Sequence, residues 1–401
     1  MIERVAGQPV PFVSRVRVRN YRSIGDCDVA LGPLTVLLGF NASGKTNFLD
    51  ALRFVSEALA QSPTQAAASR GDLDTLLHRG PAGAADSFEI WLDLRLRLPE
   101  VEGQVTATYG FEIGRDPAGE APLLVRREVG ELALPEGPLR LPLEVPGPTS
   151  RLRLPASAVD TGAAQAVLES ALTSMLFYDF DTAALAALDE PRKRSAYLLG
   201  SDGAHLGHVL RDISHHDPSA KERLDAYLAA LVPGALGVDE RPEGRYSTVQ
   251  ARFRAGERDR VEVFQREEMS EGTLRAAGVL AALFQTRVQT GRVPLVAIEE
   301  PETALHPAGV GALYEALDDA TRRTQVIVTS QSSDLLDNEY ADLTHIRAVA
   351  NVDGATVIGE VDQAGRAILD KKLMSLSELH RSGQMRPELS GPPPEPDGSN
   401  G

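Results

Sequence analysis

The sequence of 401 residues contains a single cysteine, Cys27, and this scarcity excludes two classes of protein. One thiol can form neither an intramolecular disulfide framework nor a cysteine-based zinc module, and it is typical of a reducing compartment. No apolar stretch approaches the roughly 20 residues that a membrane-spanning helix needs. The first twelve residues, MIERVAGQPVPF, contain neither an apolar signal core nor an arginine-rich transit pattern. We therefore expect a cytoplasmic protein without a membrane segment.

Basic residues are also in short supply. The chain has 41 lysines and arginines against 57 aspartates and glutamates, which gives a formal net charge of −16. This excess of acid argues against a surface coated with phosphate-binding cations, so any contact with nucleic acid has to be local. Hydrophobic residues make up 42% and charged residues 24%, the balance of a folded protein. At about 150 residues per domain, the length suggests two or three structural units.

The N-terminal part combines strand patterns with one strong helix pattern. Valines and arginines alternate over residues 15–19, which predicts a half-exposed edge strand, and the apolar run 34–38 predicts a strand buried on both faces. Residues 44–60 repeat apolar side chains at three- and four-residue spacing, which predicts an amphipathic helix. A surface loop is expected over residues 61–72. Three alternating runs after it predict antiparallel strands, at residues 88–98, 105–113 and 123–134.

The rest of the chain changes character twice. Residues 135–155 are rich in proline and glycine and predict an irregular connection, and residues 156–231 have the spacing of a helical lobe. Helix and strand patterns then alternate. We expect helices at residues 271–289 and 308–321, and strands at residues 294–298, 325–328, 345–350 and 356–361.

These patterns predict an α/β fold with an antiparallel β subdomain and an inserted helical lobe. The expected units are an N-terminal half of the core (1–135), an inserted, mainly helical lobe (136–244), a C-terminal half of the core (245–363), a helical extension (364–389) and a disordered tail (390–401). One composite core interrupted by a lobe therefore fits the chain better than two or three independent domains.

The strongest motif is GFNASGKT at residues 39–46, a full match to the G-x-x-x-x-G-K-[ST] phosphate loop. Its glycines let consecutive backbone N–H groups turn into one anion-sized hollow, and the helix that follows points its positive end at the same place. Lys45 is expected to reach the β- and γ-phosphates, and the Thr46 hydroxyl to hold Mg²⁺. The residues predicted to bind nucleotide here are Gly39, Asn41, Ala42, Ser43, Gly44, Lys45, Thr46 and Asn47. A chance surface turn is the alternative, but the buried strand before the loop and the helix after it are the context that the motif requires.

Adjacent carboxylates follow the apolar strand expected at residues 294–298. Glu299 is expected beside the Mg²⁺, and Glu300 near the γ-phosphate, where it can orient or deprotonate a water molecule. A solvated acidic turn is the alternative interpretation. The phosphate loop in the same chain favours the catalytic one.

Together these segments resemble the ABC-type ATPases of the RecF/SMC and OLD-like group, which are bacterial AAA-domain ATPases. Besides the phosphate loop, four stretches match the group in the right order: NYRS at residues 20–23, the signature-like SEGT at 270–273, EEPE with LHP at 299–307, and the switch segment TSQS at 329–332. The resemblance implies the P-loop NTPase fold of an ABC-ATPase head. It covers both ends of the predicted core and is weaker through the middle lobe.

The resemblance also implies roles for four further residues. Arg22 would lie close to the nucleotide. Ser270 and Gly272 would complete the ATP site of a second subunit, so that ATP joins two heads into a homodimer and hydrolysis releases them. An ordinary helix N-cap is the alternative for Ser270. Gln331 occupies the switch position, where the group often has histidine, and its amide can donate to the γ-phosphate as a third catalytic group but cannot carry charge.

The predicted function is therefore ATP hydrolysis with Mg²⁺, in a dimer that switches a partner in DNA repair or phage defence. The expected partner is a nuclease or another protein, with DNA contacted only locally. The alternative is an ATP-sensing scaffold that hydrolyses slowly or not at all, which the neutral Gln331 would suit. About 70 residues follow Gln331 without an acidic D-x-D cluster, so we expect no fused Toprim nuclease, and no heptad run predicts a coiled coil.

A group of histidines and two groups of arginines are weaker candidates for function. Histidines crowd one region at spacings that could ligate a metal, although surface or packing roles are favoured: His205, His208, His215 and His216. Two small basic patches are solvated faces by default, with DNA contact as the alternative: Arg15, Arg17 and Arg19, and the pair Arg322 and Arg323.

Overall fold

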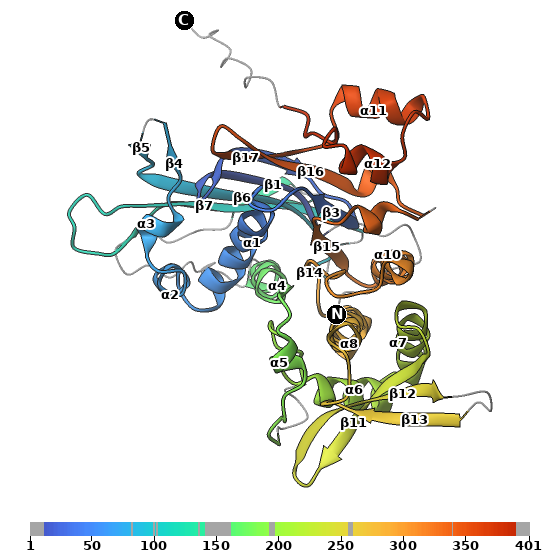
Figure 1. Ribbon diagram of the computed structural model, residues 1–401. Coiled ribbons are helices and arrows are strands. Elements are labelled where there is room, and N and C mark those ends of the chain that lie inside the picture. Colours follow the sequence, from blue (N-terminus) through green and yellow to red (C-terminus); the bar gives the residue numbers. More distant parts are fainter. Residues whose placement is uncertain are drawn as a thin grey trace, which may run out of the picture.

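The computed structural model describes residues 12–81, 83–98, 101, 103–134, 137–140, 162–191, 197–255, 260–338 and 340–389. Within these residues two six-stranded sheets form the upper part of the molecule, and a helical layer separates them from a three-stranded sheet at the opposite end (Figure 1). The predicted α/β class is confirmed. None of the helices in the described part is long and apolar enough to cross a membrane.

The first sheet is antiparallel and has the strand order β2-β1-β6-β7-β8-β9. Its strands are β1 (Val13–Tyr21), β2 (Ile24–Ala30), β6 (Ser87–Leu96), β7 (Val105–Gly114), β8 (Leu124–Leu134) and β9 (Gly137–Arg140). The three alternating runs of the sequence thus form β6, β7 and β8, as predicted. The expected edge strand at residues 15–19 is wrong, because β1 is paired on both sides, by β2 and by β6. Alternation shows that one face of a strand is exposed, and it says nothing about its two edges.

The second sheet surrounds the phosphate loop and has the strand order β10-β14-β15-β3-β16-β17. Its strands are β3 (Leu34–Leu38), β10 (Leu176–Tyr178), β14 (Leu295–Glu299), β15 (Gln325–Ser330), β16 (Ile346–Val352) and β17 (Ala355–Gly359). All neighbours are parallel except β16 and β17, which pair antiparallel. The carboxyl ends of β14, β15 and β3 therefore meet at one edge of the sheet.

Helix α1 (Lys45–Ala60) lies between the two large sheets and fills the first hydrophobic core. Its Phe54 packs edge-on against Tyr21 and Phe88 of the antiparallel sheet, with ring centroids 6.1 and 5.4 Å apart. From the parallel sheet, Leu37 and Ile327 enter the same core. The three-and-four spacing of α1 thus reflects burial against two sheets at once.

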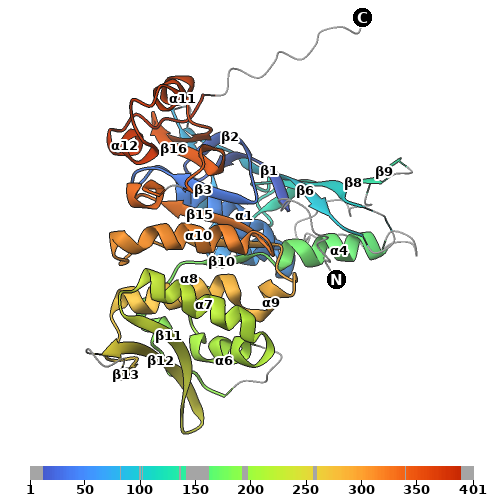
Figure 2. The ribbon, with the colours of Figure 1, turned by 90° about the vertical axis from the view of Figure 1, so that its right-hand side faces the viewer.

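Alternate residues of the parallel strands enter a second core on the opposite face of the sheet. Val36 and Val328 lie there, covered by α8 (Glu271–Phe284), α10 (Val310–Ala320) and α7 (Pro218–Leu231). Figure 2 shows these helices stacked beneath the sheet, with α6 (Leu206–His216) below them. A strand that feeds both cores has to be apolar throughout, which is the pattern seen in the sequence.

The structure corrects the expected organisation of the middle lobe. The described part contains helices α4 (Gly162–Thr173), α5 (Thr182–Leu185), α6 and α7, but β10 lies among them in sequence and pairs with β14 of the core. The lobe also has its own sheet of β11 (Ala235–Glu243), β12 (Tyr246–Ala255) and β13 (Arg260–Gln265), which the boundary at residue 244 divides. A three-residue strand is too short to show a period, so the helical pattern around it conceals it.

Smaller differences concern single elements. The expected loop at residues 61–72 contains α2 (Pro63–Ala68), which is capped by Ser62 with a proline in the first turn, and is followed by α3 (Leu73–Leu76). The helix expected at 271–289 divides at Gln285 into α8 and α9 (Thr286–Gln289). Helices α11 (Gln363–Asp370) and α12 (Leu376–Arg381) form the C-terminal extension beside β16 (Figure 2). The expected tail at 390–401 lies outside the described residues.

Candidate active site

The phosphate loop connects the carboxyl end of β3 to the first residue of α1. Ala42 and Gly44 adopt left-handed backbone conformations, with φ angles of 61° and 102°. A Cβ atom on Gly44 would stand 1.9 Å from the Thr356 hydroxyl oxygen, and one on Gly39 would stand 2.2 Å from the Val349 carbonyl oxygen. Both glycines are therefore required by close packing, and the loop is tied to β16 and β17 as well as to its flanking elements.

Lys45 is buried beneath this loop. Its Nζ donates to the carbonyl oxygens of Gly39 and Phe40, at 2.7 and 3.0 Å. Burial lowers the pKa of the Lys45 ammonium, and the nearby charges of Glu300, Glu302 and Glu299 oppose that shift. The cation is thus held at the base of the loop and faces a group of carboxylates.

Thr46 and Glu299 meet across the sheet edge. The Thr46 hydroxyl donates to Glu299 Oε2 at 2.7 Å, which joins the first turn of α1 to the end of β14. Burial raises the pKa of Glu299, while the hydrogen bond from Thr46 lowers it. A hydroxyl and a carboxylate at this distance are the oxygen donors that Mg²⁺ prefers, so these two residues fit the metal predicted between them.

Glu300 and Gln331 form a second cross-strand pair. Gln331 Nε2 donates to Glu300 Oε2 at 3.0 Å, and the Glu300 backbone N–H donates to the Thr329 carbonyl at 3.1 Å. Glu300 has a φ angle of 42°, a conformation that a residue with a side chain adopts at a cost of about 1–3 kcal/mol. With this backbone conformation the Glu300 side chain lies beside Gln331, the residue that follows β15.

The third glutamate of the run is held differently. Glu302 is 8% exposed and accepts a hydrogen bond of 2.5 Å from the Ser330 hydroxyl. In the described part of the chain its second oxygen, Oε2, has no hydrogen-bond partner. Burial raises the pKa of Glu302, and the Ser330 bond opposes this. Glu302 therefore connects the loop after β14 to the end of β15.

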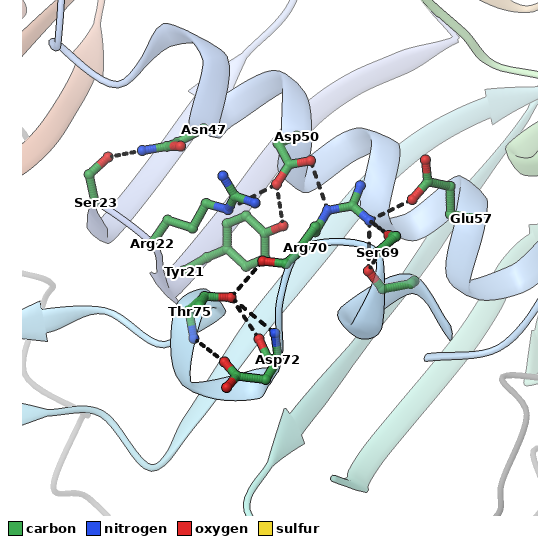
Figure 3. A network of polar contacts seen from close by, with 11 residues as sticks. Tyr21, Arg22, Ser23, Asn47, Asp50, Glu57, Ser69, Arg70, Asp72 and Thr75 are labelled. Atoms are coloured by element: carbon green, nitrogen blue, oxygen red, sulfur yellow. Dashed lines mark hydrogen bonds and ion pairs between the residues drawn. The ribbon is translucent and has the colours of Figure 1, made fainter. Parts of the chain in front are cut away.

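The NYRS segment reaches α1 through polar contacts. Asn47 donates to the Ser23 hydroxyl at 2.6 Å, and Arg22 lies 3.0 Å from Asp50 of α1 (Figure 3). The Tyr21 hydroxyl also donates to Asp50, at 2.7 Å. Arg22 is thus brought to the first two turns of the helix that begins at the phosphate loop, but its nearest carboxylate is Asp50.

Two residues near the site belong to none of the sequence motifs. Arg70 pairs with Asp50 at 2.8 Å and with Glu57 at 2.5 Å, and its side chain is almost fully buried (Figure 3). Asp179 directly follows β10, whose Tyr178 pairs with Ile298 of β14, so Asp179 stands beside Glu299 in the register. The sequence offers one signal for Asp179, an acidic residue directly after a short apolar run. This pattern is too common to identify a site residue.

The C-terminal extension touches the tip of the phosphate loop. The rings of Phe40 and His380 of α12 are stacked, with centroids 5.3 Å apart. His380 is buried, and within the described residues neither of its ring nitrogens has a hydrogen-bond partner. Burial lowers the pKa of this imidazole, and the charge of Lys45 acts in the same direction. Arg381 donates to the Ser333 hydroxyl at 2.9 Å, so α12 spans the loop after β3 and the loop after β15.

The signature-like segment begins α8 in the lower lobe. The Ser270 hydroxyl accepts the Thr273 backbone N–H at 3.2 Å, which is an N-cap bond. A Cβ atom on Gly272 would stand 2.3 Å from the Ala304 carbonyl oxygen. The start of α8 is therefore packed closely against the loop that carries the glutamates.

The weaker candidates make local contacts. His205 bonds Asp189 at 2.9 Å, His208 bonds the Glu190 carbonyl at 2.9 Å, and the other two histidines bond carbonyls one turn earlier. No cluster of three or more His, Cys, Asp or Glu side chains suited to a metal occurs in the described part of the chain. The N-terminal arginines are paired with aspartates, Arg15 with Asp28, Arg17 with Asp93 and Arg19 with Asp26.

Two protein-family models match parts of the chain. Residues 150–337 match the family model described as "AAA domain, putative AbiEii toxin, Type IV TA system", and residues 12–80 match the one described as "AAA ATPase domain". No protein among the curated sequences matches the chain.

Solved structures of SMC heads resemble most of the chain. An SMC head bound to the C-winged helix domain of ScpA has a TM-score of 0.59 at 15% identity. A head with an extended coiled coil bound to the C-terminal domain of ScpA, from Pyrococcus furiosus, has 0.56 at 12%, and a head with a coiled coil and joint from Pyrococcus yayanosii has 0.52 at 12%. Each match covers 91% of this chain and 100% of the other. At these identities the likeness shows the fold.

Proposed function

We propose that this chain, which matches AAA-domain models over two of its parts and has the fold of SMC heads, binds ATP with Mg²⁺, hydrolyses it, and uses the cycle to join and release two copies of itself. The observation that carries this proposal is a pair of contacts at one sheet edge, one from helix α1 to the end of β14 and one between the segments that follow β14 and β15. Thr46 meets Glu299 at 2.7 Å and Gln331 meets Glu300 at 3.0 Å, both beside the buried Lys45.

Each residue has a distinct task in the proposed reaction. The loop N–H groups and Lys45 bind the phosphates, and Thr46 and Glu299 hold Mg²⁺, which neutralises charge on the phosphate oxygens. Glu300 accepts the proton of the attacking water. Gln331 fixes the Glu300 carboxylate through its amide and presents the remaining N–H toward the γ-phosphate.

Dimerisation follows from the signature-like segment. Ser270 caps a 14-residue helix, and the free N–H groups at such a helix start attract a phosphate. Gly272 packs against the loop after the glutamates, so the signature-like segment lies next to the loop that carries the proposed catalytic carboxylate. In the proposed dimer this surface closes over the nucleotide of the second copy, and the assembly switches a protein or a locally held DNA in repair or phage defence.

A second candidate function is an ATP-sensing scaffold with slow turnover. The observation in its favour is the bond from Gln331 to Glu300 Oε2, which occupies part of the carboxylate that would accept the proton. A neutral amide also adds no positive charge to the transition state. In this version ATP binding alone controls the dimer.

The deciding experiment uses Glu300→Gln with Lys45→Ala as the matched control. We expect Glu300→Gln to lower phosphate release by about 10²–10⁴-fold, the usual contribution of a general base, while it still binds ATP. With Mg-ATP it should elute as a dimer in size-exclusion chromatography with light scattering, and Lys45→Ala should stay monomeric. An ATP-bound Glu300→Gln monomer would contradict the dimer. Wild-type phosphate release no higher than that of Lys45→Ala would replace the ATPase with the scaffold.

A further inference from the structure

A hollow of about 590 Å³ lies beside the edge strand β10. Arg53 and Glu57 of α1 line it, as does the chain at residues 198–201. All three residues of β10 and Arg287 of α9 also line it. We refer to this hollow as the β10 groove.

Two arginines in the β10 groove have no carboxylate partner. In the described part of the chain, no carboxylate oxygen lies within ion-pair distance of Arg53 or Arg287, whereas Arg15, Arg17 and Arg19 are all paired. The Arg53 guanidinium lies 5.6 Å from the centroid of the Phe177 ring. Two cations that line one hollow without a described carboxylate partner make the groove attractive to an acidic ligand.

The one described carboxylate of the groove is already paired. Glu57 is held by Arg70 at 2.5 Å, and Arg70 does not line the groove. Glu57 is therefore not available to pair with Arg53 or Arg287. The positive charge of the groove is left for a partner.

The floor of the groove is apolar and ends in a strand edge. Met175, Leu176, Phe177, Leu198 and Leu199 line it. Among the described strands β10 pairs only with β14. On its other side the Asp179 N–H, just after β10, donates to the Ser201 carbonyl oxygen at 2.9 Å, so only the edge at residues 176–178 is left to the groove. An extended peptide can add to such an edge through main-chain hydrogen bonds, while alternate side chains enter the groove.

The β10 groove also borders the candidate active site. Arg53 lies on α1, two turns after Thr46, and Asp179 continues β10 toward Glu299. A ligand in the groove would therefore lie against the same helix and the same pair of strands that carry Thr46 and Glu299.

We propose that the β10 groove docks an acidic peptide segment of a protein partner, with its carboxylates on Arg53 and Arg287 and an apolar side chain over Phe177. An apolar floor favours a peptide over nucleic acid, and the net negative charge of the chain repels a long polyanion. Such a segment would belong to the protein partner of the proposed switch. Only its effect on the ATP cycle rests on the proposed function, because peptide binding can be measured without ATP turnover.

The test is fluorescence anisotropy with the fluorescein-labelled peptide Glu-Glu-Leu-Phe-Glu-Glu and the intact chain. We expect saturable binding that weakens with salt, and about a tenfold loss of affinity in Arg287→Glu. Arg292→Glu is the matched control, since Arg292 is exposed on the same segment but outside the groove, and it should bind like wild type. The same peptide with glutamine in place of glutamate should not bind.

Three outcomes would overturn the proposal. They are no saturable peptide binding, equal losses in Arg287→Glu and Arg292→Glu, and tighter Arg287-dependent binding of a twelve-nucleotide thymidine oligomer than of the peptide. Arg287→Glu should keep wild-type melting temperature and basal phosphate release, which separates lost docking from misfolding. Peptide binding by a chain without ATPase activity would leave this proposal standing and remove the proposed function instead.

Discussion

On the outer face of the antiparallel sheet three arginines each meet an aspartate, whereas at the carboxyl edge of the parallel sheet three glutamates each meet a neutral donor. The first set is Arg15 with Asp28, Arg17 with Asp93 and Arg19 with Asp26, at 2.5 to 3.4 Å. The second set is Glu299 with Thr46, Glu300 with Gln331 and Glu302 with Ser330, at 2.5 to 3.0 Å. The distances are alike, but each arginine–aspartate pair has no net charge, whereas each glutamate with a neutral donor keeps its negative charge.

This difference separates a charged surface from a charged site. An arginine–aspartate pair on an exposed sheet neutralises itself and contributes little to stability. A carboxylate held by a hydroxyl or an amide is oriented but keeps its negative charge for a cation. The basic patch at residues 15–19 is therefore a poor place for DNA contact, and the edge with the glutamates suits the Mg²⁺ and the attacking water of the proposed reaction.

The largest expected effect comes from removing charge at the parallel edge. Glu299→Gln keeps an oxygen that can accept the Thr46 bond but loses a metal ligand, so we expect phosphate release to fall at least about 100-fold. The measurement is a Mg²⁺ titration of ATPase activity, in which the variant should need far more metal for half-maximal rate. Asp26→Asn, which removes a carboxylate from an ion pair on the other sheet, is the control and should behave like wild type. Equal effects of the two substitutions would show that the comparison has no functional meaning.

A half-buried carboxylate on the antiparallel sheet provides the intermediate effect. Glu128 accepts a hydrogen bond of 2.8 Å from Tyr109, and burial raises its pKa to about 7. Between its unfolded pKa and about 7 the folded state binds the extra proton, so stability falls as pH rises through this window. We expect Glu128→Gln to lose this dependence and to gain on the order of 2 kcal/mol over wild type between pH 5 and pH 8.

Urea unfolding at pH 5 and pH 8 checks this expectation. Glu120→Gln, an exposed loop position, is the control and should leave the difference between the two pH values as it is in wild type. A Glu128→Gln variant with the same pH dependence as wild type would show that a neutral donor stabilises the charged carboxylate fully at this position.

The smallest effect is expected on the outer face. Arg17 and Asp93 are 2.8 Å apart, and their side chains are 39% and 30% exposed. A double-mutant cycle with Arg17→Met and Asp93→Asn should give a coupling free energy of about 0.2–1 kcal/mol, and no change in phosphate release. The measurement is urea unfolding of the four proteins. A coupling above about 2 kcal/mol would mean that solvent does not screen this pair.

A feature could be predicted from the sequence when its residues are contiguous in the chain. The phosphate loop, the two glutamates after β14 and most strands of both large sheets were predicted at their positions. Strand β10 and Asp179 were not, because three residues show no period. The arginines of the β10 groove could not be predicted either. Arg53 and Arg287 are far apart in the sequence, and only the folded structure shows that they line one hollow without a carboxylate partner among the described residues.

The sequence by itself determined the parts whose chemistry is local. A glycine-rich turn, a lysine and a hydroxyl at the start of a helix need only their own backbone conformation, so GFNASGKT specifies the phosphate loop. Only the tertiary structure decided that Thr46 holds Glu299 and that Gln331 holds Glu300. These contacts depend on the order and register of β3, β15 and β14, and a slip of one residue in either pairing would turn the side chains to the other face.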